Sequence, residues 1–256
     1  MIIKFLGTGT SQGVPVIGCH CSVCSSDNPK DNRLRSSVFL EEDETKIVID
    51  AGPDFRQQLL REKIEDLDAV LFTHEHKDHI AGLDDIRPIN YLKKKEIDVF
   101  ATPRVIKALK REYQYIFSED PYPGIPQIKI HPVGKTRKFK VKSLEVTPVE
   151  VFHHKLPVLG FRIKNFAYIT DANMIPVKEL KKLRSLEVLV LNALRKEPHL
   201  SHFHLEAAVK MAQQIGAKKT FFTHISHLMG MHEEVNALLP ENMSLTEKFV
   251  GTVCLK

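Results

Sequence analysis

Short apolar segments that end in a polar or charged residue recur along the whole chain. Residues 69–72 (Ala-Val-Leu-Phe) run into Thr73, and residues 46–49 run into Asp50. Apolar runs of this length, bounded by turn signals, are typical of buried strands. By the same pattern we predict further strands at 2–6, 37–40, 99–101, 128–130, 138–141, 144–149, 161–163, 167–169, 188–191, 220–222 and 249–254.

Segments with helical patterning separate many of these strands. They span residues 55–62, 104–115, 176–184 and 206–215, and a further helix begins near Asp78. Strands and helices that alternate in this way predict a layered α/β fold. Residues 118–126 hold three prolines and a glycine and predict a loop. Tyr122 on this loop is a candidate for covering a substrate, although most such loops are connections only.

Aspartate and histidine recur at the carboxyl ends of the predicted strands. Ligand sites in layered α/β folds gather at strand ends, so we expect these side chains to converge although they are far apart in sequence. They are Asp50, His74, His76, His153, Asp171 and His224.

The densest cluster is Thr-His-Glu-His-Lys-Asp-His at residues 73–79. His74 and His76 are two residues apart, so in an extended chain their side chains lie on the same side. Imidazoles and a carboxylate suit zinc, manganese or iron. A solvated histidine-rich loop is the alternative, and the ligand candidates downstream argue against it. Asp50 is expected to bind this loop by hydrogen bonds, to cap the helix at 55–62, or to do both.

Cysteine usage indicates a second kind of metal site. Cys19, Cys21 and Cys24 lie within six residues, whereas Cys254 stands alone in the apolar C-terminal segment. A structural zinc needs four ligands. Cys254 fits a free core cysteine better, and His20 lies awkwardly between two thiols. A distant histidine therefore remains as the fourth ligand, and spacing alone does not say which.

Composition changes this picture little. The 256 residues are 43% hydrophobic and 27% charged, with a net charge of +5, and we expect one domain over 1–256. The positive excess fits an anionic substrate, although a solvated surface is the commoner cause. We expect a cytoplasmic protein, because the N-terminus lacks a signal-peptide core and no apolar run approaches the ~20 residues of a membrane span. The glycine-rich loop at 7–13 matches neither a dinucleotide fingerprint nor a P-loop.

The motif His74-x-His76-x-Asp78-His79, followed by a later His, Asp and His, resembles the metallo-β-lactamase superfamily. That resemblance implies a four-layer αββα sandwich with a dinuclear metal site. Residues 7–24, 153–156 and 223–227 further resemble the PhnP family, the phosphoribosyl cyclic phosphate phosphodiesterases of the carbon–phosphorus lyase pathway.

The resemblance also implies which residues bind metal. Two divalent cations, zinc or manganese, occupy the dinuclear site, and His153 is favoured over His154 as a ligand. The first cation takes His74, His76 and His153, the second takes Asp78, His79 and His224, and Asp171 bridges both. One structural zinc, in a loop at about 18–25, takes Cys19, Cys21, Cys24 and His227.

The implied reaction is hydrolysis of a small, cyclic phosphodiester by a metal-bridged hydroxide. Asp78 and Asp171 hold the hydroxide in line with phosphorus, and His202 meets the phosphate or protonates the leaving group. His204 stands where the family has an aspartate, so the tuning of that loop differs. We also expect a homodimer.

Three other readings share parts of this pattern. Transfer-RNA 3′-processing endoribonucleases have the same ligands and a histidine near position 202, but they usually carry a Gly/Pro-rich arm, where this chain shows only the Tyr122 loop. Thioester hydrolases also share the seven ligands. PqqB-type cofactor-binding modules share the cysteine signature with degraded active-site ligands, whereas all seven are present here. Hydrolysis of a nucleic acid is therefore the first alternative function, and a non-catalytic cofactor-binding module is the second.

Overall fold

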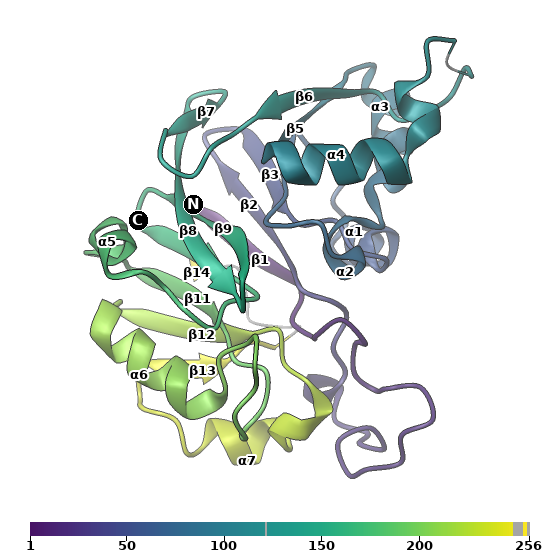
Figure 1. The fold of residues 1–256 in the computed structure, drawn as a ribbon. Helices are drawn as coiled ribbons and strands as arrows, with labels where there is room; N and C mark the ends of the chain where they lie inside the picture. The colour runs from purple at the N-terminus through teal and green to yellow at the C-terminus, as the bar shows by residue number, and fades with distance from the viewer. Residues whose placement is uncertain (121, 248–252, 255–256) are drawn as a thin grey trace.

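Two seven-stranded sheets face each other, and helices cover their outer surfaces (Figure 1). A computed structural model of the chain describes residues 1–120, 122–247 and the backbone of 253–254. The strand orders are β14-β1-β2-β3-β4-β5-β6 and β13-β12-β11-β10-β9-β8-β7. The predicted αββα sandwich is thereby confirmed.

The first sheet is built from the N-terminal half of the chain together with the last strand. Its strands are β1 (Ile2–Gly7), β2 (Ser37–Glu42), β3 (Thr45–Ile49), β4 (Ala69–Leu71), β5 (Ile97–Ala101), β6 (Ile128–Pro132) and β14 (Val253–Cys254). The helices of this half are η1 (Pro29–Asp31), α1 (Phe55–Glu62), α2 (Lys77–Ile80), η2 (Leu83–Ile86), α3 (Arg87–Lys93), α4 (Pro103–Glu112) and η3 (Gln114–Phe117). β3 to β6 run parallel, so their carboxyl ends meet at one edge.

The second sheet repeats this plan. Its strands are β7 (Phe139–Val141), β8 (Leu144–His153), β9 (Leu156–Ile163), β10 (Phe166–Ile169), β11 (Val188–Asn192), β12 (Lys219–Thr223) and β13 (Met243–Leu245). Its helices are α5 (Val177–Leu180), η4 (Lys181–Leu183), α6 (Leu205–Ile215), η5 (His227–Met229) and α7 (His232–Asn236). β10 to β13 are parallel, so this sheet also gathers its strand ends at one edge.

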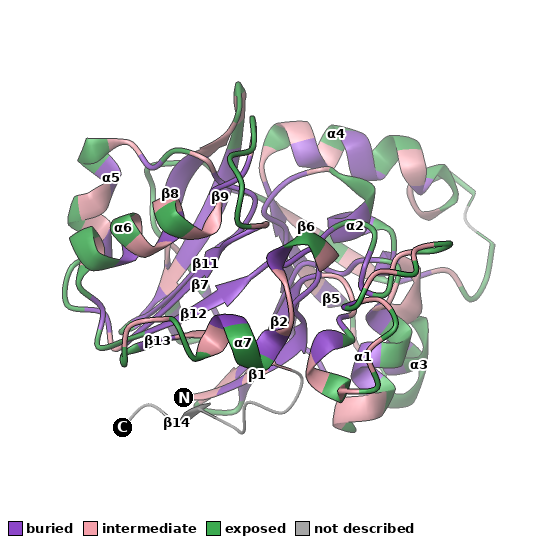
Figure 2. Ribbon diagram, turned by 90° about the horizontal axis from the view of Figure 1, so that it is seen from below, coloured by how far each residue is buried: buried purple, intermediate pink, exposed green. Residues whose placement is uncertain are grey.

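Alternation along the strands explains the layers. Ile47 and Ile49 of β3 enter the apolar cluster between the sheets, whereas Val48 packs toward the helices. Tyr168 of β10 likewise faces the opposite sheet, and Ile169 faces the outer cluster that includes α6 residues. Strands covered on both faces need apolar residues at successive positions. Figure 2 shows the result, with buried strands between partly exposed helices.

Local signals place several helices. Thr102 caps α4 by accepting a hydrogen bond from the Val105 N–H, and Pro103 occupies the first turn. α6 ends at Gly216, whose φ of 71° is the left-handed conformation that favours glycine. α1 follows Asp54 at its N-cap, so the alternative in which Asp50 caps this helix was wrong.

The boundaries differ from prediction mainly where elements are short. α3, α7 and β13 were not predicted, and β8 continues to His153 as one strand. Of the predicted strand at 249–254, residues 249–252 and the Cys254 side chain lie outside the described residues. Residues 118–120 and 122–126 contain no helix or strand, and Tyr122 is exposed. None of the helices that the structure describes is both long and apolar enough to cross a membrane.

Candidate metal centres

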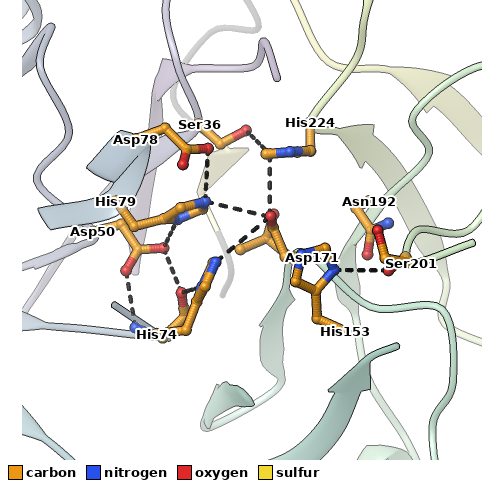
Figure 3. A network of polar contacts seen from close by, with 12 residues as sticks. Ser36, Asp50, His74, Asp78, His79, His153, Asp171, Asn192, Ser201 and His224 are labelled. Carbon is orange, nitrogen blue, oxygen red and sulfur yellow. Dashed lines mark hydrogen bonds and ion pairs between the residues drawn. The ribbon is translucent and has the colours of Figure 1, made fainter. Parts of the chain in front are cut away.

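Ends of both sheets bring histidines and aspartates together at one place (Figure 3). The loop after β4 and the short α2 supply residues 74–79. His153 ends β8, Asp171 and His224 follow β10 and β12, and His202 lies in the loop before α6. The side chains whose ligand atoms approach one another include His74, His76, Asp78, His79, His153, Asp171, His202 and His224. The convergence predicted from the strand ends is therefore present.

Three residues of this region have a left-handed backbone, although none is glycine. Asp50, Asp171 and His224 have φ values of 64°, 59° and 58°. This conformation is uncommon for such residues and persists where the surroundings enforce it. Behind Asp171, the side chain of Asn192 accepts from the Ala172 N–H (2.8 Å) and donates to the Ala172 carbonyl (2.9 Å). The turn that aims Asp171 is thus fixed by a buried amide.

The carboxylate of Asp171 occupies the middle of the cluster. Its Oδ1 lies 3.1 Å from His224 Nδ1 and 3.4 Å from His79 Nε2. Its Oδ2 lies 3.7 Å from His74 Nε2. Asp78 Oδ2 is 3.1 Å from the same His79 nitrogen. One carboxylate therefore faces imidazoles of both proposed ligand groups.

Asp50 lies behind the ligand loop and holds it. Its carboxylate accepts from the Thr73 N–H (2.9 Å), the Thr73 hydroxyl (2.8 Å) and His79 Nδ1 (2.7 Å). This confirms the expectation that Asp50 binds the ligand loop. Because Nδ1 of His79 is engaged, Nε2 is the nitrogen left for a cation.

Unpartnered nitrogens show that the cluster fits bound cations. Nε2 of His74 and Nε2 of His79 are both buried and have no hydrogen-bond partner among the described residues. Leaving a buried polar atom unpaired costs about 1–3 kcal/mol. Two divalent cations beside the Asp171 carboxylate would satisfy these nitrogens, one each, and imidazole with carboxylate is a donor set for zinc, manganese or iron.

Burial and charge set the protonation of these groups. Burial lowers the pKa of His74 well below its usual value and also lowers the pKa of His224, which keeps both rings in the neutral, cation-binding form. Burial opposes ionisation of Asp171, but the nearby His224 and His79 outweigh it and hold the Asp171 pKa well below its ordinary value. The Asp171 carboxylate is therefore ionised.

The structure separates the two adjacent histidines after β8. The His153 ring lies 5.1 Å from the His76 ring and 5.9 Å from the His74 ring, and His153 Nδ1 donates to the Ser201 carbonyl (2.8 Å). His154 is exposed, with a φ of 57°. His153 is thus the one of the pair that lies in the cluster.

His202 lies against the same cluster from the loop before α6. Its ring centroid is 4.5 Å from that of His153 and 5.0 Å from that of His224. The side chain is buried, and its Nδ1 has no hydrogen-bond partner among the described residues. Burial lowers the His202 pKa to about 3, so the ring is neutral in the metal-free protein.

The cysteine cluster forms a second, separate centre. His227 Nδ1 lies 3.3, 3.4 and 3.5 Å from the sulfurs of Cys19, Cys21 and Cys24. A tetrahedron with ordinary zinc–sulfur and zinc–nitrogen bonds has edges of about 3.5 Å between sulfur and nitrogen. A hydrogen bond from the Cys24 backbone and another with His227 lower the Cys21 pKa to about 6. His20 is exposed.

Two supporting residues were not identified from the sequence. Arg33 is buried and donates to the Thr8 hydroxyl (3.0 Å), the Thr246 carbonyl (2.6 Å) and His232 Nδ1 (2.9 Å). Nothing local in the sequence marks its role. Asn192 has a weak signal, because it is a polar residue that ends an apolar strand.

Comparisons with known proteins agree with this geometry. A family model described as the beta-lactamase superfamily domain matches residues 45–225. A crystal structure described as that of a new diphosphatase from the PhnP family has a chain whose sequence is 40% identical to this one. The two structures superpose with a TM-score of 0.90, and the match covers 96% of this chain and 94% of that one. Zinc-bound PqqB from Methylobacterium extorquens is 19% identical with a TM-score of 0.79 over 100% of both chains, which shows the fold alone.

The curated relatives that match this chain are longer than it is. A protein named octanoyltransferase, from Porphyromonas gingivalis, is 41% identical over 240 residues, which are 93% of this chain and 48% of the relative. The chain spans about half the length of the curated relatives it matches, at 48%, 40% and 51% for three of them.

Proposed function

We propose that this chain, which belongs to the β-lactamase superfamily and within it to the PhnP family, hydrolyses a small, cyclic phosphodiester with the help of two divalent cations. The observation that carries the proposal is the Asp171 carboxylate between two buried imidazole nitrogens, on His74 and His79, that have no hydrogen-bond partner among the described residues. Three of the groups of side chains that could hold a cation share this carboxylate.

The ligands are assigned to the cations by their grouping. The first cation takes His74, His76 and His153, the second takes Asp78, His79 and His224, and Asp171 bridges them; the near approaches of these side chains support this division. Zinc and manganese both fit the donors. When bound, such a pair stabilises charge on a phosphoryl oxygen and brings the pKa of water toward 7.

The chain's own residues then orient the reaction. Asp78 and Asp171 are placed to accept hydrogen bonds from an attacking water and fix its direction. His202 lies beside the cluster, where it can hold the departing oxygen of the ester and give it a proton. A phosphate bound there adds negative charge, which raises the pKa of His202 and favours the protonated ring.

The cysteine cluster serves a structural zinc in this proposal. Cys19, Cys21, Cys24 and His227 supply four ligands at spacings that suit a tetrahedron. His227 is three residues beyond His224 in the same segment. The zinc therefore supports the loop that delivers a ligand to the dinuclear site.

Turnover of bis(p-nitrophenyl) phosphate and of a ribosyl cyclic phosphate tests the proposal. The wild type, loaded with zinc or manganese, is expected to hydrolyse both. His76→Ala should abolish turnover together with metal occupancy, because it removes a ligand. His202→Ala should lower turnover by about 10²–10⁴-fold and leave metal content unchanged, because it removes only an acid. Unchanged turnover in His202→Ala would exclude this residue from the reaction.

Two further substrates and a measurement of metal content separate the alternative functions. Cleavage of a precursor transfer RNA with strongly salt-dependent affinity would favour a nuclease, because phosphate contacts release counterions. Hydrolysis of an octanoyl thioester would favour the thioester reading. A protein that binds about one zinc per chain, where the proposal expects about three, would favour a non-catalytic module.

We also propose a homodimer that forms through the outer face of α1 and α3. Leu60 is 62% exposed, Tyr91 82% and Leu92 71%. The groove beside them is rimmed by residues of both signs, Arg56, Glu65, Asp85 and Lys93. A two-fold axis through such a surface can place Arg56 or Lys93 of one copy against Glu65 or Asp85 of the other. Light scattering that gives twice the chain mass, and the single mass for Leu92→Glu, is the expected result.

A further inference from the structure

A cavity of about 550 Å³ lies at the end of β8 that is farther from the dinuclear centre. Its lining includes Leu144, the first residue of β8, whereas His153 is the last residue of the same strand. At about 3.3 Å per residue, the length of β8 separates these two ends by about 30 Å. The cavity is therefore remote from the proposed reaction, which uses none of its residues.

The cavity lies in the most positively charged part of the chain. Residues 129–184 contain thirteen lysines and arginines but four aspartates and glutamates, an excess of nine positive charges in a chain whose net charge is +5. Four of these cations line the cavity, Lys138, Arg162, Lys164 and Lys182, together with two carboxylates. A concave surface with this excess of positive charge concentrates anions.

Arg162 differs from the three lysines because it has no carboxylate partner. Each lysine forms an ion pair with a glutamate. The Arg162 guanidinium, in contrast, bonds only to backbone carbonyls among the described residues. Burial lowers the pKa of Arg162, and no carboxylate acts against this effect. A half-buried charge without a counter-ion is unfavourable, so binding of an anion beside it would be favoured.

The same backbone carbonyls hold the guanidinium in place. Nε donates to the Lys164 carbonyl (2.8 Å), and Nη1 donates to the carbonyls of Lys182 (2.6 Å) and Arg184 (2.9 Å). Nη2 has no hydrogen bond to any of the described residues, so its two N–H groups are left for a ligand. Because the side chain is already fixed, it loses little freedom when it binds.

Hydroxyl groups lie on the same wall of the cavity. Thr147 of β8 is directly opposite Arg162 of β9, so the two side chains are on the same face of the sheet. Thr147 and Ser143 both line the cavity. An arginine that is fixed in place and two hydroxyls are donors that suit a phosphate group.

The remaining lining indicates what else the ligand carries. The volume lies within the range of about 300–1,000 Å³ that small-molecule sites occupy, so there is room for more than a phosphate ion. Eight of the nine lining side chains are polar or charged, Leu144 being the exception, and none is aromatic. Asp43 and Glu145 supply acceptors for hydroxyl groups. This lining suits a sugar better than a nucleobase.

We infer that this cavity binds a sugar phosphate, with the phosphate at Arg162 and the sugar hydroxyls toward Asp43 and Glu145. The site is separate from the dinuclear centre, and the inference does not depend on the reaction proposed for that centre. It assigns to the chain a second ligand, which is bound and not converted.

Calorimetry at fixed ionic strength tests this inference with glucose 6-phosphate, inorganic phosphate and glucose as the three ligands. Arg162→Gln removes the guanidinium. Arg111→Gln is the matched control, because it removes the same charge from α4, where Arg111 pairs with Glu112. Arg162 also bonds three carbonyls, so Lys138→Gln is a second test. The Lys138 side chain is 57% exposed, and its one ion pair is with Glu145.

We expect wild type and Arg111→Gln to bind glucose 6-phosphate equally. Arg162→Gln should weaken this binding at least tenfold, because a hydrogen-bonded charge is lost. Lys138→Gln should weaken it about threefold, as an exposed charge does. Inorganic phosphate should bind about tenfold more weakly than glucose 6-phosphate, since it makes no bonds to the carboxylates, and glucose should not bind measurably.

His76→Ala separates this cavity from the dinuclear centre. It removes a proposed cation ligand at the other end of the sandwich, so its affinity for glucose 6-phosphate should stay within about twofold of wild type. Loss of binding in His76→Ala would place the phosphate at the cations and overturn the inference.

Other results would also contradict it. Equal affinities in Arg162→Gln and Arg111→Gln would show that Arg162 does not bind the phosphate. Inorganic phosphate that binds as tightly as glucose 6-phosphate would overturn the assignment of a sugar. Melting temperatures without ligand show whether each variant is folded. If Arg162→Gln is unfolded, Lys138→Gln decides, and an unchanged affinity there overturns the inference.

Discussion

Asp171 shows how much a single residue depends on its neighbours. Its carboxylate lies in the middle of the cluster only because the backbone there is left-handed, with a φ of 59°. The amide of Asn192 holds the next peptide from both sides, through the N–H and the carbonyl of Ala172. The geometry at the centre is thus set by a residue that binds no cation itself.

We therefore predict that Asn192→Ala destabilises the protein by about 2 kcal/mol, because a buried N–H and a buried carbonyl lose their partner. Cation affinity should fall as well, since the turn that aims Asp171 is released. Urea unfolding and metal analysis measure the two effects. Asn242→Ala is the control, because the Asn242 amide makes one long bond to the Ala217 carbonyl (3.4 Å). Equal metal content in both variants would show that Asn192 does not position Asp171.

His232 gives a prediction about pH. Its Nδ1 accepts from Arg33 (2.9 Å), with Glu247, Glu233 and Lys30 also nearby. Burial, and then the charge of Arg33, lower the His232 pKa below its usual value. Below the unfolded value of about 6.5, the unfolded chain binds this proton more readily, so its contribution to stability is lost as the pH falls.

His232→Gln keeps an acceptor for Arg33 and removes the titration. The free energy of unfolding of the metal-free variant should fall less than that of wild type between pH 7.5 and about 5. Denaturant unfolding at both pH values measures the difference, and the other histidines contribute equally to both proteins. Identical losses would mean that His232 does not titrate differently on folding.

At the scale of elements, α4 connects the ligand loop to the second sheet. Arg104 near its start lies 3.0 Å from Glu75, which stands between His74 and His76. The same guanidinium donates to the Pro157 carbonyl on β9 (2.5 Å). β9 pairs with β8 at the His153 end. One side chain therefore spans the two segments that supply the first proposed cation site.

Arg104→Ala is expected to lower the cation affinity of that site by about tenfold, as loss of a group that orients ligands usually does. It should lower the affinity of the other cation site less. Competition with a metal chelator measures both affinities. Arg111→Ala on the same helix is the matched control, because Arg111 contacts only Glu112 at the exposed surface among the described residues. Equal affinities in the two variants would contradict the role given to Arg104.

At the scale of the whole molecule, the pattern of apolar and polar residues predicted those elements that depend on interactions between residues close in sequence. Apolar runs with polar ends located most strands, and the alternation of buried positions required two covered sheets. The short α3, α7 and β13 were missed because a few residues carry too little periodicity and tertiary packing decides them. The roles of Arg33 and Asn192 were not predicted, since each depends on partners that only the folded chain brings near.

In the candidate site too, the residues close in sequence were predicted, whereas the arrangement that depends on folding was not. The residues 73–79 carry their chemistry in one short stretch, so the cluster was recognisable from sequence. Which of the two histidines after β8 faces the cluster depends on strand register, and the structure fixes it through the hydrogen bond from His153 to the Ser201 carbonyl. Both sheets contribute ligands, so the site exists only when the sandwich is assembled.

Anomalous diffraction at the zinc edge, from crystals grown with saturating zinc, tests the central claim most directly. We predict two peaks about 3.5–4 Å apart on either side of the Asp171 carboxylate, and a third among Cys19, Cys21, Cys24 and His227. A map with density at the cysteines alone, and none beside Asp171, would contradict a dinuclear hydrolase.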